Sequence, residues 1–196
     1  ASGARLSVNC STRGLLQKDF PERIGALAAA AGLDPSRLEL EVTETSIMHD
    51  VEASAAVLRR IADMGVAVAL DDFGTGYSSL ARLRSLPLST IKIDKSFVFG
   101  FLENEQDRGI IDTILSIAAR LGLRVVAEGV ETEAQASYLR ESGCELAQGY
   151  LYAKPLSRED LGGFLASTPL LSADYAPSPS AEGSAFTYVS QKKYVP

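Results

Sequence analysis

Six short β-rich runs alternate with segments of helical periodicity, and this alternation limits the fold more than any other feature of the chain. The runs are Leu6–Asn9, Leu38–Glu44, Val66–Asp71, Thr90–Asp94, Arg124–Glu128 and Leu146–Tyr152. Between them, apolar residues recur three or four positions apart in Ile24–Ala31, Val51–Met64, Ile110–Leu121 and Glu133–Leu139. Alternation of this kind predicts an α/β fold of parallel strands with helices packed outside them.

The polarity of the strands distinguishes between a doubly wound sheet and a barrel. In the run 38–44 the apolar side chains share one face, whereas Glu39 and Glu41 share the other. A central strand of an open doubly wound sheet is apolar on both faces. A barrel with a polar mouth has one apolar and one partly charged face. We therefore predict an incomplete (βα)8 TIM-like barrel with about six of its eight strands.

Polar residues mark the end of every predicted strand. They are Asn9, Glu41, Asp71 with Asp72, Lys92, Glu128 and Gln148. In a barrel these residues converge on one face, where four carboxylates would repel one another unless cations balanced them. Oxygen ligands favour Mg²⁺, Mn²⁺ or Ca²⁺ over zinc, and two adjacent aspartates suit a two-metal site. A single carboxylate at a strand end is more often a solvated cap or ion-pair partner, so the residues alone leave both interpretations open.

Charge and cysteine content exclude some classes of function. The net charge of −6 argues against broad nucleic-acid binding, which needs a clustered basic surface. The two cysteines, Cys10 and Cys144, are too few for a disulfide framework and suit a reducing compartment. No apolar run approaches the roughly 18 residues of a membrane span. We expect a cytoplasmic domain, whose parent protein could still be anchored through an upstream segment.

Six sequence blocks resemble the EAL-domain family of bacterial cyclic-di-GMP phosphodiesterases. The blocks are Val8-Asn9-Cys10-Ser11, Glu41-Val42-Thr43-Glu44, Asp71-Asp72-Phe73-Gly74-Thr75-Gly76-Tyr77-Ser78-Ser79-Leu80, Lys92-Ile93-Asp94, Ala127-Glu128-Gly129-Val130-Glu131 and Gln148-Gly149-Tyr150. The resemblance implies a (βα)8-like barrel that opens cyclic-di-GMP to linear pGpG with Mg²⁺ or Mn²⁺, in bacterial second-messenger signalling.

The resemblance also implies a role for each matched residue. Asn9, Glu41, Asp71 and Asp72 correspond to metal ligands. Lys92 and Glu128 correspond to the catalytic pair that positions the attacking water, with Gln148 beside them. Glu44, Glu131 and Asp94 correspond to supporting residues, and Glu44 to the anchor of the loop that runs from Phe73 to Leu80.

One part of the family pattern has no counterpart in this chain. The Glu-Ala-Leu segment that names the family precedes the asparagine block, and this chain begins almost at that block. We therefore interpret residues 1–171 as an EAL domain without its N-terminal strands, and 172–196 as a disordered tail rich in Ser, Ala and Pro. We expect the chain alone to be inactive or nearly so. The alternative is a non-catalytic module that binds cyclic-di-GMP or a protein partner, and a homodimer, an upstream sensor or a GGDEF domain also fits.

Overall fold

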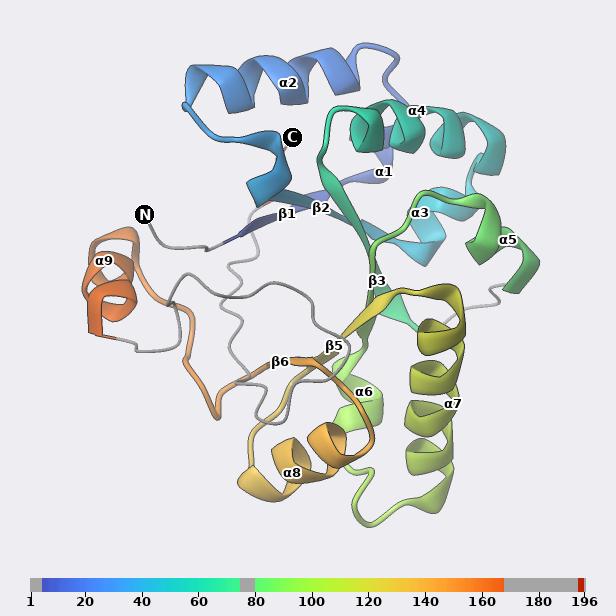
Figure 1. Ribbon diagram of the computed structural model, residues 1–196, viewed down its shortest axis with the longest axis vertical. Helices are drawn as coiled ribbons and strands as arrows, with labels where there is room; N and C mark the ends of the chain where they lie inside the picture. Colours follow the sequence, from blue (N-terminus) through green and yellow to red (C-terminus); the bar gives the residue numbers. More distant parts are fainter. Residues whose placement is uncertain (1–4, 75–79, 168–193, 196) are drawn as a thin grey trace.

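Six parallel strands follow one another around a curved sheet in the order in which they occur in the chain (Figure 1). The computed structural model describes residues 5–74, 80–167 and 194–195. The six strands are β1 (Leu6–Cys10), β2 (Leu38–Thr43), β3 (Ala67–Phe73), β4 (Thr90–Ile93), β5 (Arg124–Glu128) and β6 (Leu146–Gln148). Each pairs in parallel with the next, which is the strand order of a TIM-type barrel. The predicted fold class, a barrel with six of its strands present, is therefore confirmed.

Helices connect the strands, and Figure 1 shows α2, α4, α7 and α8 around the outer side of the sheet. The helices are α1 (Thr12–Leu15), α2 (Phe20–Ala30), α3 (Glu44–Met48), α4 (Val51–Asp63), α5 (Leu80–Ser85), α6 (Lys95–Val98), α7 (Glu105–Leu121), α8 (Glu133–Glu141) and α9 (Arg158–Ser167), with a 3-10 turn η1 at Pro35–Arg37. The four predicted helices correspond to α2, α4, α7 and α8. The short helices α1, α3 and α6 were not predicted, because four or five residues are too few to show a helical period.

The apolar core lies between the strands and the outer helices. Outward-facing strand residues such as Leu40 and Ile91 are 1% and 0% exposed, and Leu58 of α4 and Ile111 of α7 are fully buried among them. The opposite, inward faces of the same strands carry polar groups, including Glu41, which is also buried. The alternation read from the sequence therefore sorts the strands correctly into an apolar outer and a polar inner face.

Three predicted strands end earlier than expected. The run 90–94 stops at Ile93, because Asp94 caps α6. The run 38–44 stops at Thr43, because the hydroxyl of this residue accepts a hydrogen bond from the backbone N–H of Ser46 (3.2 Å) and caps α3. The last run stops at Gln148, and Tyr150 then lies in a turn with 60% of its surface exposed. Residues 149–152 of the predicted run therefore lie beyond the strand.

A two-residue strand, β7 (Tyr194–Val195), pairs in parallel with the outer edge of β1. The rest of the segment 172–196 lies outside the described residues, so the disorder expected there stays a prediction. Within the described parts of the chain, no helix combines the length and the apolar character that a membrane span needs.

Candidate metal site at the strand ends

Three of the predicted site residues have the same spacing from a residue that caps a helix. Each lies on the inner face of a strand, two positions before the residue that caps the following short helix. The pairs are Asn9 with Ser11, Glu41 with Thr43, and Lys92 with Asp94. The capping side chains accept hydrogen bonds from the backbone N–H of Gly14 (3.1 Å), Ser46 (3.2 Å) and Ser96 (2.9 Å). The cap fixes where the strand stops, and so fixes which side chain is the last to point inward.

Lys92 of β4 lies among carboxylates from three other strands. Its Nζ is 2.9 Å from Glu41 Oε2 of β2, 3.1 Å from Asp71 Oδ1 of β3 and 2.6 Å from Glu128 Oε1 of β5. Lys92 is 1% exposed, and the three acidic residues are buried as well. Four strand ends that are far apart in the sequence thus meet around one ammonium group.

These contacts are close ion pairs between buried groups. All three distances lie within hydrogen-bond range, and a side-chain hydrogen bond with Glu128 adds to the charge interactions of Lys92. Strong charge interactions of this kind are typical of sites shielded from water.

The electrostatic environment keeps Lys92 protonated. Burial alone would lower the pKa of its ammonium group, but Glu128, Glu41 and Asp71, in that order of effect, raise the pKa above its ordinary value. A lysine with a raised pKa cannot serve as a general base near neutral pH. It can supply positive charge and N–H donors.

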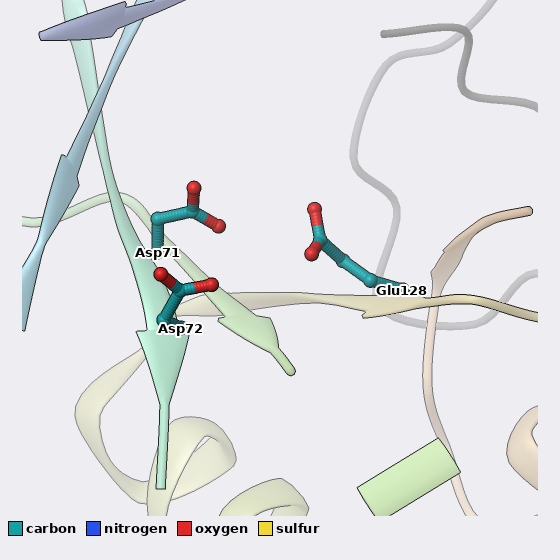
Figure 2. Close-up of side chains that lie close together, drawn as sticks. All are labelled: Asp71, Asp72 and Glu128. Carbon is teal, nitrogen blue, oxygen red and sulfur yellow. The ribbon is translucent and has the colours of Figure 1, made fainter. Parts of the chain in front are cut away.

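Asp71, Asp72 and Glu128 form an acidic cluster next to this ammonium. One carboxylate oxygen of each lies within 4.8 Å of the other two. Figure 2 shows the carboxylates of Asp71 and Asp72, from β3, pointing toward the carboxylate of Glu128 at the end of β5. Anionic oxygens at this spacing suit a hard divalent cation, so the donor set fits the predicted Mg²⁺ or Mn²⁺.

An irregularity in β3 brings the two adjacent aspartates to the same side. Successive strand residues normally point to opposite faces. Asp72, however, has a backbone φ of 55°, the only positive φ of a non-glycine residue in the described chain, and the register with β4 shifts between Leu70 and Phe73. This bulge turns the Asp72 carboxylate toward Asp71, which a regular strand would prevent.

Asn9 and Gln148 lie on the two strands that flank the strands of this site, β1 next to β2 and β6 next to β5. The strand registers place Asn9 beside Glu41 and Gln148 beside Glu128. Within the described structure, Asn9 Nδ2 and Gln148 Oε1 are buried atoms without a hydrogen-bond partner. Buried polar atoms are costly without a partner, so water or a ligand would have to satisfy each of these two amides.

The three predicted supporting residues are placed less directly. Asp94 caps α6; burial raises its pKa, but hydrogen bonds from Ser96 and Lys95 and the charge of Lys95 outweigh this and lower the pKa overall. Glu44 is buried at the start of α3, but residues 75–79 of the loop that it is predicted to anchor lie outside the described residues. Glu131 is exposed, and its backbone N–H donates to Gln135 Oε1 (2.8 Å). Their roles stay predictions.

A second polar layer, which the sequence analysis missed, lies deeper inside the barrel. Glu39 Oε2 accepts hydrogen bonds from Thr90 Oγ1 (2.9 Å) and Arg124 Nη2 (3.0 Å), and Glu39 Oε1 accepts one from Ser7 Oγ (3.3 Å). Strand alternation contained the signal, because Ser7, Glu39 and Thr90 each precede Asn9, Glu41 and Lys92 by two positions. The inner face of the sheet is thus polar at two successive levels.

The fold and these strand ends define an α/β-barrel domain with an acidic site at its mouth. Residues 1–155 match the family model of the EAL domain, and the chain belongs to that family. Among curated proteins, it is 42% identical over 178 residues to the cyclic di-GMP phosphodiesterase NbdA of Pseudomonas aeruginosa, covering 88% of this chain and 23% of that protein. It is also 42% identical over 163 residues to the oxygen sensor protein DosP of Escherichia coli, covering 83% of this chain and 20% of that protein. The chain thus spans about a quarter or less of these relatives.

Solved EAL structures have the same fold. The EAL domain of Mycobacterium smegmatis DcpA superposes with a TM-score of 0.78 at 40% identity, covering 83% of this chain and 73% of that one. The phosphodiesterase PaMucR, in complex with c-di-GMP, gives 0.77 at 39% identity, covering 80% and 64%. Klebsiella pneumoniae BlrP1, in a complex with manganese and cy-diGMP, gives 0.72 at 32% identity, covering 76% and 38%.

Proposed function

We propose that this chain is part of a domain that hydrolyses one phosphodiester of cyclic-di-GMP, giving linear pGpG, in a metal-dependent reaction. The observation that carries the proposal is the cluster of Asp71, Asp72 and Glu128 beside Lys92, at the strand ends where barrel enzymes of this type keep their active sites. The relative NbdA is named a cyclic di-GMP phosphodiesterase, and PaMucR was solved with c-di-GMP bound, which supports the choice of substrate.

The metal ligands would come from the acidic cluster and its neighbours. Asp71, Asp72 and Glu128 offer oxygens at the right spacing, and Asn9 and Glu41 lie beside them at the ends of β1 and β2. Divalent metal at this position would lower the pKa of a water and offset the negative charge that builds up on the transferring phosphoryl group. The manganese complex of BlrP1 makes Mn²⁺ the first ion to test, with Mg²⁺ as the second.

Lys92 and Glu128 would orient the attacking water. The ammonium of Lys92 stays protonated, so it would donate N–H bonds and place positive charge near the phosphate. The Glu128 carboxylate, 2.6 Å from Lys92 Nζ, would accept a proton or hydrogen bond from the water. Gln148 lies beside Glu128 in the strand register, and its buried Oε1 would accept a bond from substrate or water.

Glu44, Glu131 and Asp94 would support the site without contacting the metal. Glu44 is buried at the first position of α3, at the end of β2, so its carboxylate would hold the loop after Phe73 by accepting backbone N–H bonds. Glu131 and Asp94 would support the site through the turns that follow β5 and β4. We further propose that the domain works in the cytoplasm and is part of a longer signalling protein. The second part is supported by the MucR relative, which is named a bifunctional diguanylate cyclase and cyclic di-GMP phosphodiesterase.

The test is a hydrolysis assay of the purified 196-residue chain with cyclic-di-GMP and Mn²⁺ or Mg²⁺, in which pGpG is separated by chromatography. The same assay is run on a longer version that contains any in-frame upstream coding sequence. Asp71→Ala should abolish turnover, whereas Asp63→Asn, at an exposed position at the end of α4, should not change it. Cyclic-di-GMP binding without turnover in both versions would identify a non-catalytic binding module, and neither binding nor turnover would overturn the proposal.

A further inference from the structure

We propose that Lys92 is a tethered counter-cation that holds the acidic strand ends together in the metal-free protein, and that a bound divalent metal takes over this task. This inference rests on the proposed metal site. It assigns to Lys92 a structural task in the free protein, separate from any contact with substrate.

The position of Lys92 in the sheet supports this role. Its strand, β4, lies between β3 and β5, and β2 is the next strand beyond β3. Lys92 Nζ reaches a carboxylate from each of these three strands, at 2.6–3.1 Å. One buried ammonium group therefore links four adjacent strands at the end of the sheet where their like charges would otherwise repel one another.

The residues that Lys92 contacts overlap with the acidic cluster. Asp71 and Glu128 belong to both sets: each forms an ion pair with Lys92 Nζ, and each lies with Asp72 in the acidic cluster. Carboxylate oxygens are also the preferred ligands of hard divalent ions, so a bound divalent ion can satisfy the oxygens that Lys92 contacts on these two residues. The two cations thus share the carboxylates of Asp71 and Glu128, and the fold needs at least one cation beside them.

The deeper polar layer provides a matched comparison within the chain. Arg124 Nη2 pairs with Glu39 Oε2 at 3.0 Å and also donates to Thr90 Oγ1 at 3.0 Å. Glu39 is buried like Glu41, one inward position farther along the same strand toward its N-terminal end. Arg124 is thus also a tethered cation for a buried carboxylate, but its carboxylate partner is outside the acidic cluster.

The first experiment measures thermal unfolding of the full chain, with chelator and with saturating Mn²⁺. In chelator, Lys92→Met should lower the midpoint by roughly 6–20 °C, because removing one partner leaves buried charge uncompensated. Mn²⁺ should restore most of that loss. Arg124→Met should also lower the midpoint, but Mn²⁺ should raise it no more than it raises the wild-type midpoint. Equal Mn²⁺ effects on the two variants, or a Lys92→Met variant as stable as wild type in chelator, would overturn the inference.

The second experiment needs no metal and separates this inference from the proposed function. In chelator, Glu41→Gln should lower the midpoint of the wild type, because it removes a partner of Lys92. In the Lys92→Met background the same change should raise the midpoint, because it removes one of three repelling carboxylates. In the Arg124→Met background, Glu41→Gln should again lower the midpoint. The same sign in all three backgrounds would contradict the counter-cation role, whereas failure of Mn²⁺ to bind the wild type in calorimetry would contradict the proposed metal site instead.

Discussion

The left-handed backbone at Asp72 can be tested by comparing two substitutions that both remove the carboxylate. Asp72→Ala keeps a Cβ at a φ of 55°, whereas Asp72→Gly does not. A left-handed conformation costs a residue with a Cβ about 1–2 kcal/mol. Glycine loses about 0.5–1 kcal/mol more backbone entropy on folding than alanine. The midpoints of these ranges leave Asp72→Gly more stable than Asp72→Ala by about 0.75 kcal/mol, or about 1.5–3 °C in melting temperature for a chain of this size.

The assay is urea unfolding and thermal melting of both variants in chelator, so that metal binding does not contribute. Ala69, two positions before Asp71 on the same strand, is the control, because its φ is not positive and it is fully buried. There the change from alanine to glycine should have the opposite sign and lower the unfolding free energy by at least about 0.5–1 kcal/mol. If Asp72→Ala equals or exceeds Asp72→Gly in stability, the strand is not bulged at this position and the pairing of the two aspartates needs another explanation.

Four further predictions concern the site and the core. Asp71→Ala in a hydrolysing form of the domain should lower kcat by at least about 10²-fold at saturating Mn²⁺, and retained turnover would remove Asp71 from the ligand set. Gly149→Ala should lower the unfolding free energy by about 2 kcal/mol or more, because the added Cβ would overlap the backbone of Val130. If the variant unfolds at the same urea concentration as the wild type, this prediction is wrong. Burial raises the pKa of both the Cys10 and the Cys144 thiol from 9.0 to about 12, so neither should react with a thiol reagent at pH 8 unless the protein unfolds. The same shift predicts that stability falls as pH rises above about 9, since only the unfolded thiols then lose protons.

The barrel could be predicted from the sequence because one simple rule governs it. Alternation along β2 separates the inward Glu39 and Glu41 from the outward Leu40 and Val42, and β4, Thr90–Ile93, alternates in the same way. The convergence of the strand ends then follows from the parallel order alone. The sequence predicted that Lys92 and the acidic residues meet at the strand ends. It did not predict which of them form ion pairs, because that depends on the direction of each side chain across the strands.

The bulge at Asp72 could not be predicted. Adjacent aspartates in a strand are expected to face opposite sides, and no glycine or proline marks the irregularity at that residue. The short helices after β1, β2 and β4 were missed for a related reason: they depend on single capping residues such as Thr43, which also occur within strands. Local capping chemistry and tertiary strain, more than hydrophobic period, decide these features.

The two-residue spacing between an inward site residue and the following cap also determines where the chain tolerates insertions. One residue added between Asn9 and Ser11 would leave the cap in place but turn the asparagine to the outer face, because side chains alternate along a strand. The same addition after α1 would lengthen only the connection to α2, leaving the strand in register (Figure 1). Length variation compatible with this site therefore belongs beyond the short helices, and loops there can diverge in size while the strand ends keep their geometry.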